Sequence, residues 1–166
     1  MRHIHSQKVE LSLPLPEKEA LVDGDLCLHL DRIDPADPVR WNAPAYQFLL
    51  VHTRDGEVMG HISLRVSNSA EIVQYAGHVG YGVLPQFRGH RFAARACRLL
   101  VPLAKTLGLD PLWITCNPDN WASRRTCELA GAELVEIVTV PEDSPMAIRG
   151  ELTKCRYRLD VSVIDD

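Results

Sequence analysis

The feature that most constrains the fold is a change of hydrophobic period near the middle of the chain. Residues 78–84 alternate between two kinds of position, which predicts a β-strand. From residue 89 to residue 107 the apolar positions instead recur every three or four residues, which predicts a helix that Gly108 ends. Pro102 lies inside this helical pattern and predicts a bend, because proline has no backbone N–H to donate.

A second unit of the same kind follows in the chain. Residues 112–116 are predicted as a strand and residues 121–130 as a helix, with Gly131 as its stop. Two parallel strands that each feed a helix bring both helix starts to the same edge of the sheet. Ligands of open α/β sheets bind at that edge, beyond the carboxyl ends of the strands.

The segments on either side of these units predict further strands. Residues 46–52 and 58–66 are rich in β-formers and are joined through residues 54–56, whose Asp-Gly pair is a strong hairpin signal. Residues 134–140 and 155–163 close the chain as two more strands.

The first part of the chain is less regular. Residues 9–15 and 26–30 alternate as short strands do. Residues 31–45 carry three prolines and three aspartates, which predicts a loop, and loops of this kind often line substrate sites.

Composition narrows the possible functions. The chain has 166 residues, 46% of them hydrophobic, and a net charge of -4, which fit one globular domain over residues 1–166. A dedicated nucleic-acid binder is excluded because it would need a basic surplus. No membrane-spanning apolar run, secretory signal or zinc-spaced Cys/His cluster is visible, and the five cysteines are widely spaced. We therefore expect a cytoplasmic protein without a metal.

The turn before the first helix has the chemistry of an anion site. A helix start presents unpaired N–H groups, and Gly89 would let a phosphate approach the backbone closely. Arg88 and Arg91 add guanidinium groups that suit phosphate oxygens. The alternative is an ordinary solvent-exposed basic turn. On the second helix, Asn120, Ser123 and Cys127 are spaced to share one face, although Asn120 can equally be only the helix cap.

From residue 46 onward the chain resembles the GCN5-related N-acetyltransferase (GNAT) superfamily. Residues 82–93 resemble that family's strand and pyrophosphate loop, whose pattern is Gln/Arg-x-x-Gly-x-Gly/Ala. Gln86 and Gly89 fit this pattern, whereas Arg91 replaces the final small residue. Residues 120–132 are similar to the family's second CoA-contacting helix.

The resemblance implies an α/β fold with a mixed sheet, in which a central, mostly antiparallel sheet has a splayed parallel pair and helices on both faces. Residues 46–166 would form the core with the CoA site, and residues 1–45 a variable region on the acceptor side. Acetyl-CoA would be the co-substrate, and a primary amine, either a small molecule or a protein N-terminus, would attack it directly. The implied CoA contacts are Val83, Gln86, Arg88, Gly89, His90, Arg91, Phe92, Ala93, Asn120 and Ser123.

The catalytic residues are less defined. Relatives often place a tyrosine acid seven residues after the helix asparagine, where this chain has Cys127. Its thiol could be the acid, a nucleophile that forms an acyl-cysteine, or a small buried side chain. His78 is the chosen general base, with a hydrogen-bonded structural histidine as the alternative. Tyr81 is predicted to orient the substrate, and Glu71 and Tyr75 are weaker candidates for the base.

Two other functions compete with this reading. A catalytically silent, CoA-binding regulatory module would explain the missing tyrosine and the lack of a clear base. A nucleotide-binding protein of another fold is the poorest option, because no Gly-rich P-loop or GxGxxG follows a strand. The sequence leaves the oligomeric state open, with a homodimer as one option.

Overall fold

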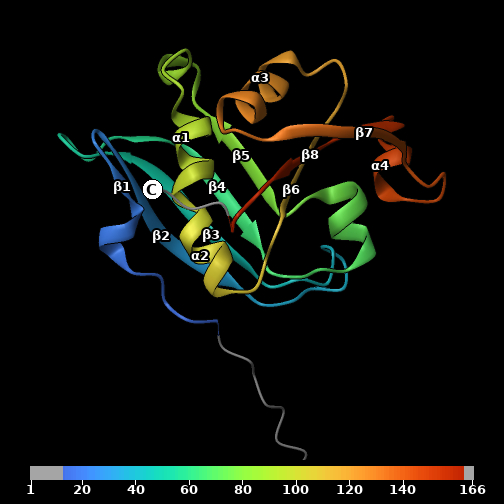
Figure 1. Cartoon of the computed structure of the whole chain (residues 1–166), viewed down its shortest axis with the longest axis horizontal. Coiled ribbons are helices and arrows are strands. Elements are labelled where there is room, and N and C mark those ends of the chain that lie inside the picture. The colour runs from blue at the N-terminus through green and yellow to red at the C-terminus, as the bar shows by residue number, and fades with distance from the viewer. Residues whose placement is uncertain (1–12, 163–166) are drawn as a thin grey trace, which may run out of the picture.

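The computed structural model describes residues 13–162 and contains two antiparallel sheets (Figure 1). The larger sheet has the strand order β1-β2-β3-β4-β5 and the smaller one the order β6-β8-β7. Their strands are β1 (Val22–Asp23), β2 (Leu26–Asp34), β3 (Ala45–His52), β4 (Val58–Arg65), β5 (Val79–Val83), β6 (Leu112–Cys116), β7 (Glu133–Thr139) and β8 (Thr153–Leu159).

Helical segments connect the strands. They are the 3-10 turns η1 (Lys18–Leu21) and η3 (Pro85–Phe87), the π-turn η2 (Ile72–Ala76), and the α-helices α1 (Phe92–Leu99), α2 (Val101–Thr106), α3 (Trp121–Leu129) and α4 (Pro145–Ile148). The single long helix predicted over residues 89–107 is divided into α1 and α2. Pro102 stands in the first turn of α2, so the bend that it predicts is present.

β5 and β6 form the splayed pair at the junction of the two sheets. At their start the N–H of His78 donates to the carbonyl oxygen of Trp113 at 2.7 Å. Beyond this point the two strands have no residue pairing in the described chain, and each leads to a helix at the same end, β5 to α1 and β6 to α3 (Figure 1). The sheet therefore opens between β5 and β6 toward the helix starts.

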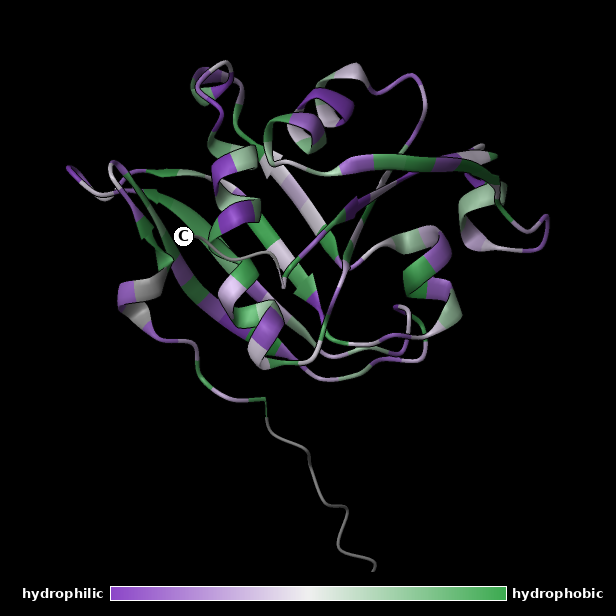
Figure 2. Ribbon diagram, viewed as in Figure 1, coloured by the Kyte–Doolittle hydropathy of each residue, from purple (hydrophilic) through white to green (hydrophobic). Residues whose placement is uncertain are grey.

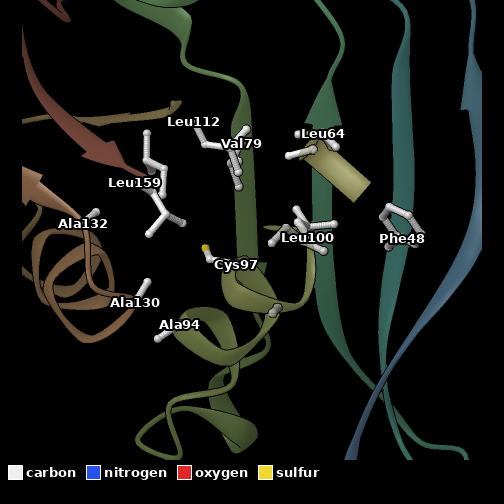
Figure 3. Close-up of a cluster of buried hydrophobic side chains, with 14 of the residues drawn as sticks. Phe48, Leu64, Val79, Ala94, Cys97, Leu100, Leu112, Ala130, Ala132 and Leu159 are labelled. Atoms are coloured by element: carbon white, nitrogen blue, oxygen red, sulfur yellow. The ribbon is translucent and has the colours of Figure 1, made fainter. Parts of the chain in front are cut away.

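The core lies between the sheets and the helices. Figure 2 shows hydrophobic residues along the central strands and interleaved with hydrophilic ones on α1 and α2. Phe48 and Leu64 of the larger sheet face Cys97 and Leu100 of the helical layer, all less than 2% exposed (Figure 3). Truncating such a side chain, as in Leu100→Ala, typically costs about 2–5 kcal/mol. This packing fixes α1, and with it the turn before the helix.

The predicted hairpin and the predicted loop after residue 30 compare differently with the structure. The hairpin through Asp55 and Gly56 is present between β3 and β4, and Gly56 has the positive φ of 74° that such a turn needs. β2, in contrast, continues to Asp34, four residues into the predicted loop, because those residues pair with β3 across a bulge. The strand predicted over 9–15 and the end of the one over 155–163 reach outside the described residues.

The helices do not cover the two faces equally. α1 and α2 pack on one face of the larger sheet, and α3 continues that layer over β6. On the other face the helical cover is η2, which was not predicted. Thr115 of β6 donates through its hydroxyl to the Tyr75 carbonyl at 2.8 Å, and Arg156 of β8 donates to the Val73 carbonyl at 3.0 Å. η2 thus covers the smaller sheet beside the splay.

Candidate active site

Strand β5 offers free backbone groups to the splay. Its antiparallel register with β4 pairs Gly80 with Ser63 and Gly82 with His61. Since the alternation of such a ladder directs every second residue's N–H and C=O away from the neighbour, those of Tyr81 and Val83 point away from β4. One of these groups, the Val83 carbonyl, already has a partner, because Arg88 Nε donates to it at 3.0 Å.

The start of α1 is open. Gly89 has a φ of 89° and Arg91, the N-cap residue, a φ of 62°, so the chain enters the helix through left-handed backbone. No side chain caps the helix. The N–H groups of the first turn, at Phe92, Ala93 and Ala94, therefore have no partner within the helix and carry its positive dipole end. This helix start has the backbone geometry that an anion site requires.

The start of α3 is closed by its own cap. Asn120 accepts a hydrogen bond on Oδ1 from the N–H of Ser123 at 3.1 Å. Beside Asn120 and Ser123 of its first turn, α3 also presents a side face to the splay. That face carries Ala122, Thr126 and Leu129, which sequence reasoning missed. Their i, i+4, i+7 spacing was the signal that could have revealed it.

A cavity of about 650 Å³ lies between these two helices. Eight of the ten predicted CoA contacts line it, and only Gln86 and His90 stand outside, where both are exposed. Arg125 of α3 and Phe87 of η3 complete the wall. The eight predicted residues that line the cavity are Val83, Arg88, Gly89, Arg91, Phe92, Ala93, Asn120 and Ser123.

A second, smaller cavity of about 280 Å³ lies between β5 and the end of β6. It shares Tyr81, Asn120 and Ser123 with the larger cavity, so the two spaces meet at these residues. Its other walls come from β4, η2, β6, α4, β8 and the segment before β3. They include Trp41, Arg65, Tyr75, Thr115, Asn117, Arg149, Glu151 and Lys154.

Tyr81 stands where the cavities meet. Its hydroxyl lies 2.7 Å from Ser123 Oγ, 3.3 Å from the Ser123 carbonyl oxygen and 3.8 Å from Cys127 Sγ. Burial raises the pKa of Tyr81 well above its usual value of 10, so the hydroxyl keeps its proton at neutral pH. Tyr81 can therefore act as a hydrogen-bond donor at this point.

Cys127 has the environment of a core residue. It is fully buried, belongs to the hydrophobic core, and is part of neither cavity wall. Burial raises the pKa of its thiol to about 12, which keeps it protonated and unreactive as a nucleophile. Of the three interpretations of Cys127, the geometry favours the small buried side chain over the acid and the acyl-cysteine.

Both ring nitrogens of His78 have hydrogen-bond partners within the fold. The residue is fully buried, its Nδ1 accepts from the N–H of Trp113 at 2.9 Å, and its Nε2 lies 3.1 Å from Asn68 Oδ1. Burial lowers the pKa of His78 to about 4. With both ring nitrogens bonded and no access to either cavity, His78 fits the structural alternative rather than the general base. Glu71 is exposed outside both cavities, and Tyr75 lines the smaller one.

The family follows from a comparison with domain models. Residues 25–133 match the model described as "Acetyltransferase (GNAT) domain", which covers both strand–helix units and the splay between them. The chain belongs to the GNAT acetyltransferase family. No sequence among the curated proteins matches it.

Solved GNAT structures share the fold at low sequence identity. A GNAT-family acetyltransferase from Bacillus anthracis superposes with a TM-score of 0.55 at 17% identity, over 69% of this chain and 66% of the other. The ribosomal-protein-S5-alanine acetyltransferase from Vibrio fischeri gives 0.56 at 17% identity, over 74% and 64%. The Microcin C7 self-immunity acetyltransferase MccE, in complex with acetyl-CoA and AMP, gives 0.55 at 18%, over 70% and 61%. The match therefore spans about two thirds or less of these proteins' lengths.

Within residues 13–162, no three His, Cys, Asp or Glu side chains gather as a metal-binding group would. In the same part of the chain, no helix has the length and apolarity needed to cross a bilayer.

Proposed function

We propose that this protein is an N-acetyltransferase that moves the acetyl group of acetyl-CoA to a primary amine. The observation that carries the proposal is the meeting of two cavities at Tyr81. The larger cavity contains an open helix start and arginines, which suit a diphosphate. The smaller one leads to the same point from the side where an acceptor could enter.

The larger cavity fits coenzyme A by its chemistry. The N–H groups at the start of α1, with Arg88 and Arg91, would bind the diphosphate. The free N–H and C=O groups of Tyr81 and Val83 would bind the amides of the pantetheine arm as an added strand does. The guanidinium of Arg88 would leave the Val83 carbonyl and become available to the diphosphate. MccE, whose fold is similar, has been crystallised with acetyl-CoA, which supports this choice of co-substrate.

The chemistry at the junction would be direct transfer. Acetyl-CoA supplies a thioester whose carbonyl carbon the neutral amine nitrogen attacks, and holding the two together supplies much of the acceleration. A free N–H of β5 would stabilise the negative oxygen that develops. When the carbon–sulfur bond breaks, the Tyr81 hydroxyl donates a hydrogen bond to the departing thiolate sulfur. The attacking nitrogen gives up one proton to solvent as the amide forms, and the thiolate takes up a proton from solvent to leave as the CoA thiol.

Tyr81 thus takes the part that the family resemblance assigns to the position of Cys127. Its hydroxyl reaches Cys127 and Ser123 of α3 from the opposite strand. The pKa of Tyr81 is raised by burial, so the proton remains on the phenol and the group serves as a donor, not as a base. The acceptor amine would enter in its neutral form, with its proton lost to solvent.

The proposal is tested by following free thiol release when the purified protein is incubated with acetyl-CoA and a panel of amines. We expect at least one amine to raise the rate well above hydrolysis. For that amine, log kcat/KM should rise with unit slope up to the pKa of the amine itself, since no buried histidine limits it. Thiol release that no amine accelerates would overturn the proposal.

A second candidate function has one observation in its favour. His78 and Cys127, the residues from which sequence reasoning expected acid–base chemistry, are both buried away from the cavities. A regulatory module that binds CoA without turnover would need neither. It predicts saturable CoA binding together with no acceptor-dependent thiol release from any amine, and a Tyr81-dependent rate would exclude it.

A further inference from the structure

We propose that the acceptor amine carries an oxyanion group, a carboxylate or a phosphate, and that Arg65 binds it in the smaller cavity. This inference rests on the proposed function and specifies its substrate class. It follows from an arginine that has no acidic partner within residues 13–162, from the charge of the cavity wall, and from the position of that arginine relative to Tyr81.

Arg65 ends strand β4 and is half-buried, and its guanidinium is only partly satisfied. Nη1 donates to the backbone carbonyls of Gly77 at 3.0 Å and of Ala76 at 3.4 Å. Across residues 13–162, no carboxylate lies within 4.0 Å of it. Two buried cations of the neighbouring β8 differ in this respect, since Lys154 pairs with Glu151 and Arg156 with Glu136. Burial alone lowers the pKa of Arg65, yet a guanidinium stays charged at neutral pH.

The charge of the cavity wall favours an anionic guest. Its lining holds three cationic side chains, Arg65, Arg149 and Lys154, and one carboxylate, Glu151. Glu151 already accepts from Arg149 at 2.9 Å and from Lys154 at 3.3 Å. One carboxylate offsets only one of the three cations, so the wall keeps a surplus of two positive charges, and a plain alkylammonium would be repelled. An acceptor with its own oxyanion would offset part of this charge at Arg65.

The position of Arg65 lets one molecule bind it and still reach the thioester. Gly80 of β5 has no side chain, which gives the Arg65 guanidinium space beside the strand. A Cβ at that residue would lie 3.3 Å from Arg65 Nη2. The guanidinium therefore lies over the face of β5 that Gly80 presents, and the Tyr81 side chain alternates to the other face. Both residues line the same cavity of about 280 Å³, which lies at the splay between β5 and β6. A cavity of this size suits an amino-acid-sized molecule with its oxyanion on Arg65 and its amine near the Tyr81 hydroxyl.

Trp41 gives the site a wall on the side of the N-terminal region. It lines the smaller cavity together with Arg65. It belongs to a loop with left-handed backbone, in which φ is 61° at Trp41 and 49° at Asn42. Non-glycine residues keep such angles only where their surroundings enforce them. The loop that the sequence marked as a substrate-side segment therefore places an aromatic ring beside the unpaired arginine.

The experiment compares matched acceptors on the same protein. ω-Amino acids from glycine to 6-aminohexanoate are assayed with acetyl-CoA beside alkylamines of equal length, and phosphoethanolamine beside ethanolamine. We expect kcat/KM for the best anionic acceptor to exceed that of its neutral partner by about 30-fold, as one charge-assisted pair provides. The best chain length reports the distance from Arg65 to the thioester, and the phosphate pair distinguishes the two oxyanions.

Variants assign the preference to Arg65. In Arg65→Met the ratio between anionic and neutral acceptors should fall to near one, and Arg65→Lys should restore part of it. Arg54→Met, which removes an exposed arginine at the β3–β4 turn, should leave the ratio unchanged. Because both acceptors are measured on one sample, a partly unfolded variant changes both rates and not their ratio.

Three results would overturn the inference. The first is equal use of neutral and anionic amines, and the second is a preference that survives Arg65→Met. The third applies if no amine turns over: calorimetry then detects no binding of N-acetylglycine, N-acetyl-6-aminohexanoate or N-acetylphosphoethanolamine to the CoA-loaded protein. Each of these presupposes that CoA binds. Failure to bind CoA at all would instead count against the proposed function, so the two failures are distinguishable.

Discussion

The two strand–helix units of this protein, β5–α1 and β6–α3, look alike in sequence but present different surfaces to the splay between them. The first ends in an uncapped helix start with two residues in left-handed backbone, Gly89 and Arg91. The second ends in a helix start that Asn120 caps, and it turns a side face toward the cavity. Of the two helix starts, only that of α1 is left open for an anion, and α3 supplies a wall.

This difference shows that capping decides whether the N–H groups of a helix start are available to a ligand. Both helices have unpaired first-turn N–H groups by construction. A cap such as that of Asn120 uses one of these groups and places a side-chain oxygen in front of the helix. Where the N-cap residue is an arginine without a capping bond, the positive end of the helix stays available to a ligand.

The largest effect should come from reversing the charge at the open start. Arg91→Asp removes a cation and places a carboxylate where the diphosphate would bind, so the Kd for CoA should rise roughly 100- to 1,000-fold. Aspartate tolerates the left-handed backbone of this position, and a negative charge suits a helix start, so the melting temperature should hold. Isothermal titration calorimetry measures the affinity. Arg125→Asp, the same change on the side face of α3, should cost less than about tenfold; equal losses would refute the distinction between the helices.

The next effect concerns the side chain that links the two units. Tyr81→Phe removes the hydroxyl that reaches Ser123 and Cys127 while keeping the ring. We expect kcat to fall roughly 100-fold, with the Kd for CoA unchanged within about twofold, because the hydroxyl acts on the leaving sulfur. Steady-state kinetics and calorimetry on one preparation test this. Cys127→Ser serves as the matched variant, and a larger loss of kcat there than in Tyr81→Phe would return the acid role to Cys127.

A third prediction concerns His78, which sits where β5 and β6 still touch. Its pKa is lowered from 6.5 to about 4 in the folded protein, so the unfolded chain binds the extra proton first as pH falls. Stability is then lost between pH 6.5 and 4, by about 2 kcal/mol from pH 7 to pH 5. Urea unfolding at several pH values measures it. His78→Gln should flatten this slope, whereas His29→Asn, at an exposed position, should not.

The smallest effect should come from the closed start of α3. Asn120→Ala removes the cap and should lower the free energy of unfolding by about 1 kcal/mol, since a lost N-cap costs about 0.5–2 kcal/mol. The Kd for CoA should change less than about threefold, because no anion binds at this helix start. Asn120→Asp keeps an acceptor oxygen and should keep the stability. A loss of CoA affinity comparable to that of Arg91→Asp would show that both helix starts hold the diphosphate.

Sequence reasoning succeeded where a local pattern decides the structure. The alternation of β5, the helical period of α1 and the stop at Gly108 each depend on neighbours along the chain, and Pro102 located the bend by itself. The turn around Gly89 was also recognisable, because left-handed backbone and close approach favour glycine.

Sequence reasoning had little to work with where the answer depends on contacts distant in sequence. His78 and Cys127 have the right chemistry for catalysis, and only their packing against Trp113, Asn68 and the core shows that they are buried. Arg65 carried no local signal, because its lack of an acidic partner is a property of β4, β5 and η2 together. On α3, sequence reasoning found Asn120 and Ser123 of the cavity wall. It chose Cys127 as the third residue and missed Ala122, Thr126 and Leu129, because a helix has several stripes of small and polar residues.

The central claim is that the open start of α1 holds the diphosphate of coenzyme A. Isothermal titration calorimetry with CoA and with pantetheine, which has the same thiol arm but no diphosphate, tests it most directly. The account predicts saturable binding of one CoA per chain and binding of pantetheine at least roughly 100-fold weaker. Equal affinity for the two, or no heat from CoA on folded protein, would contradict it.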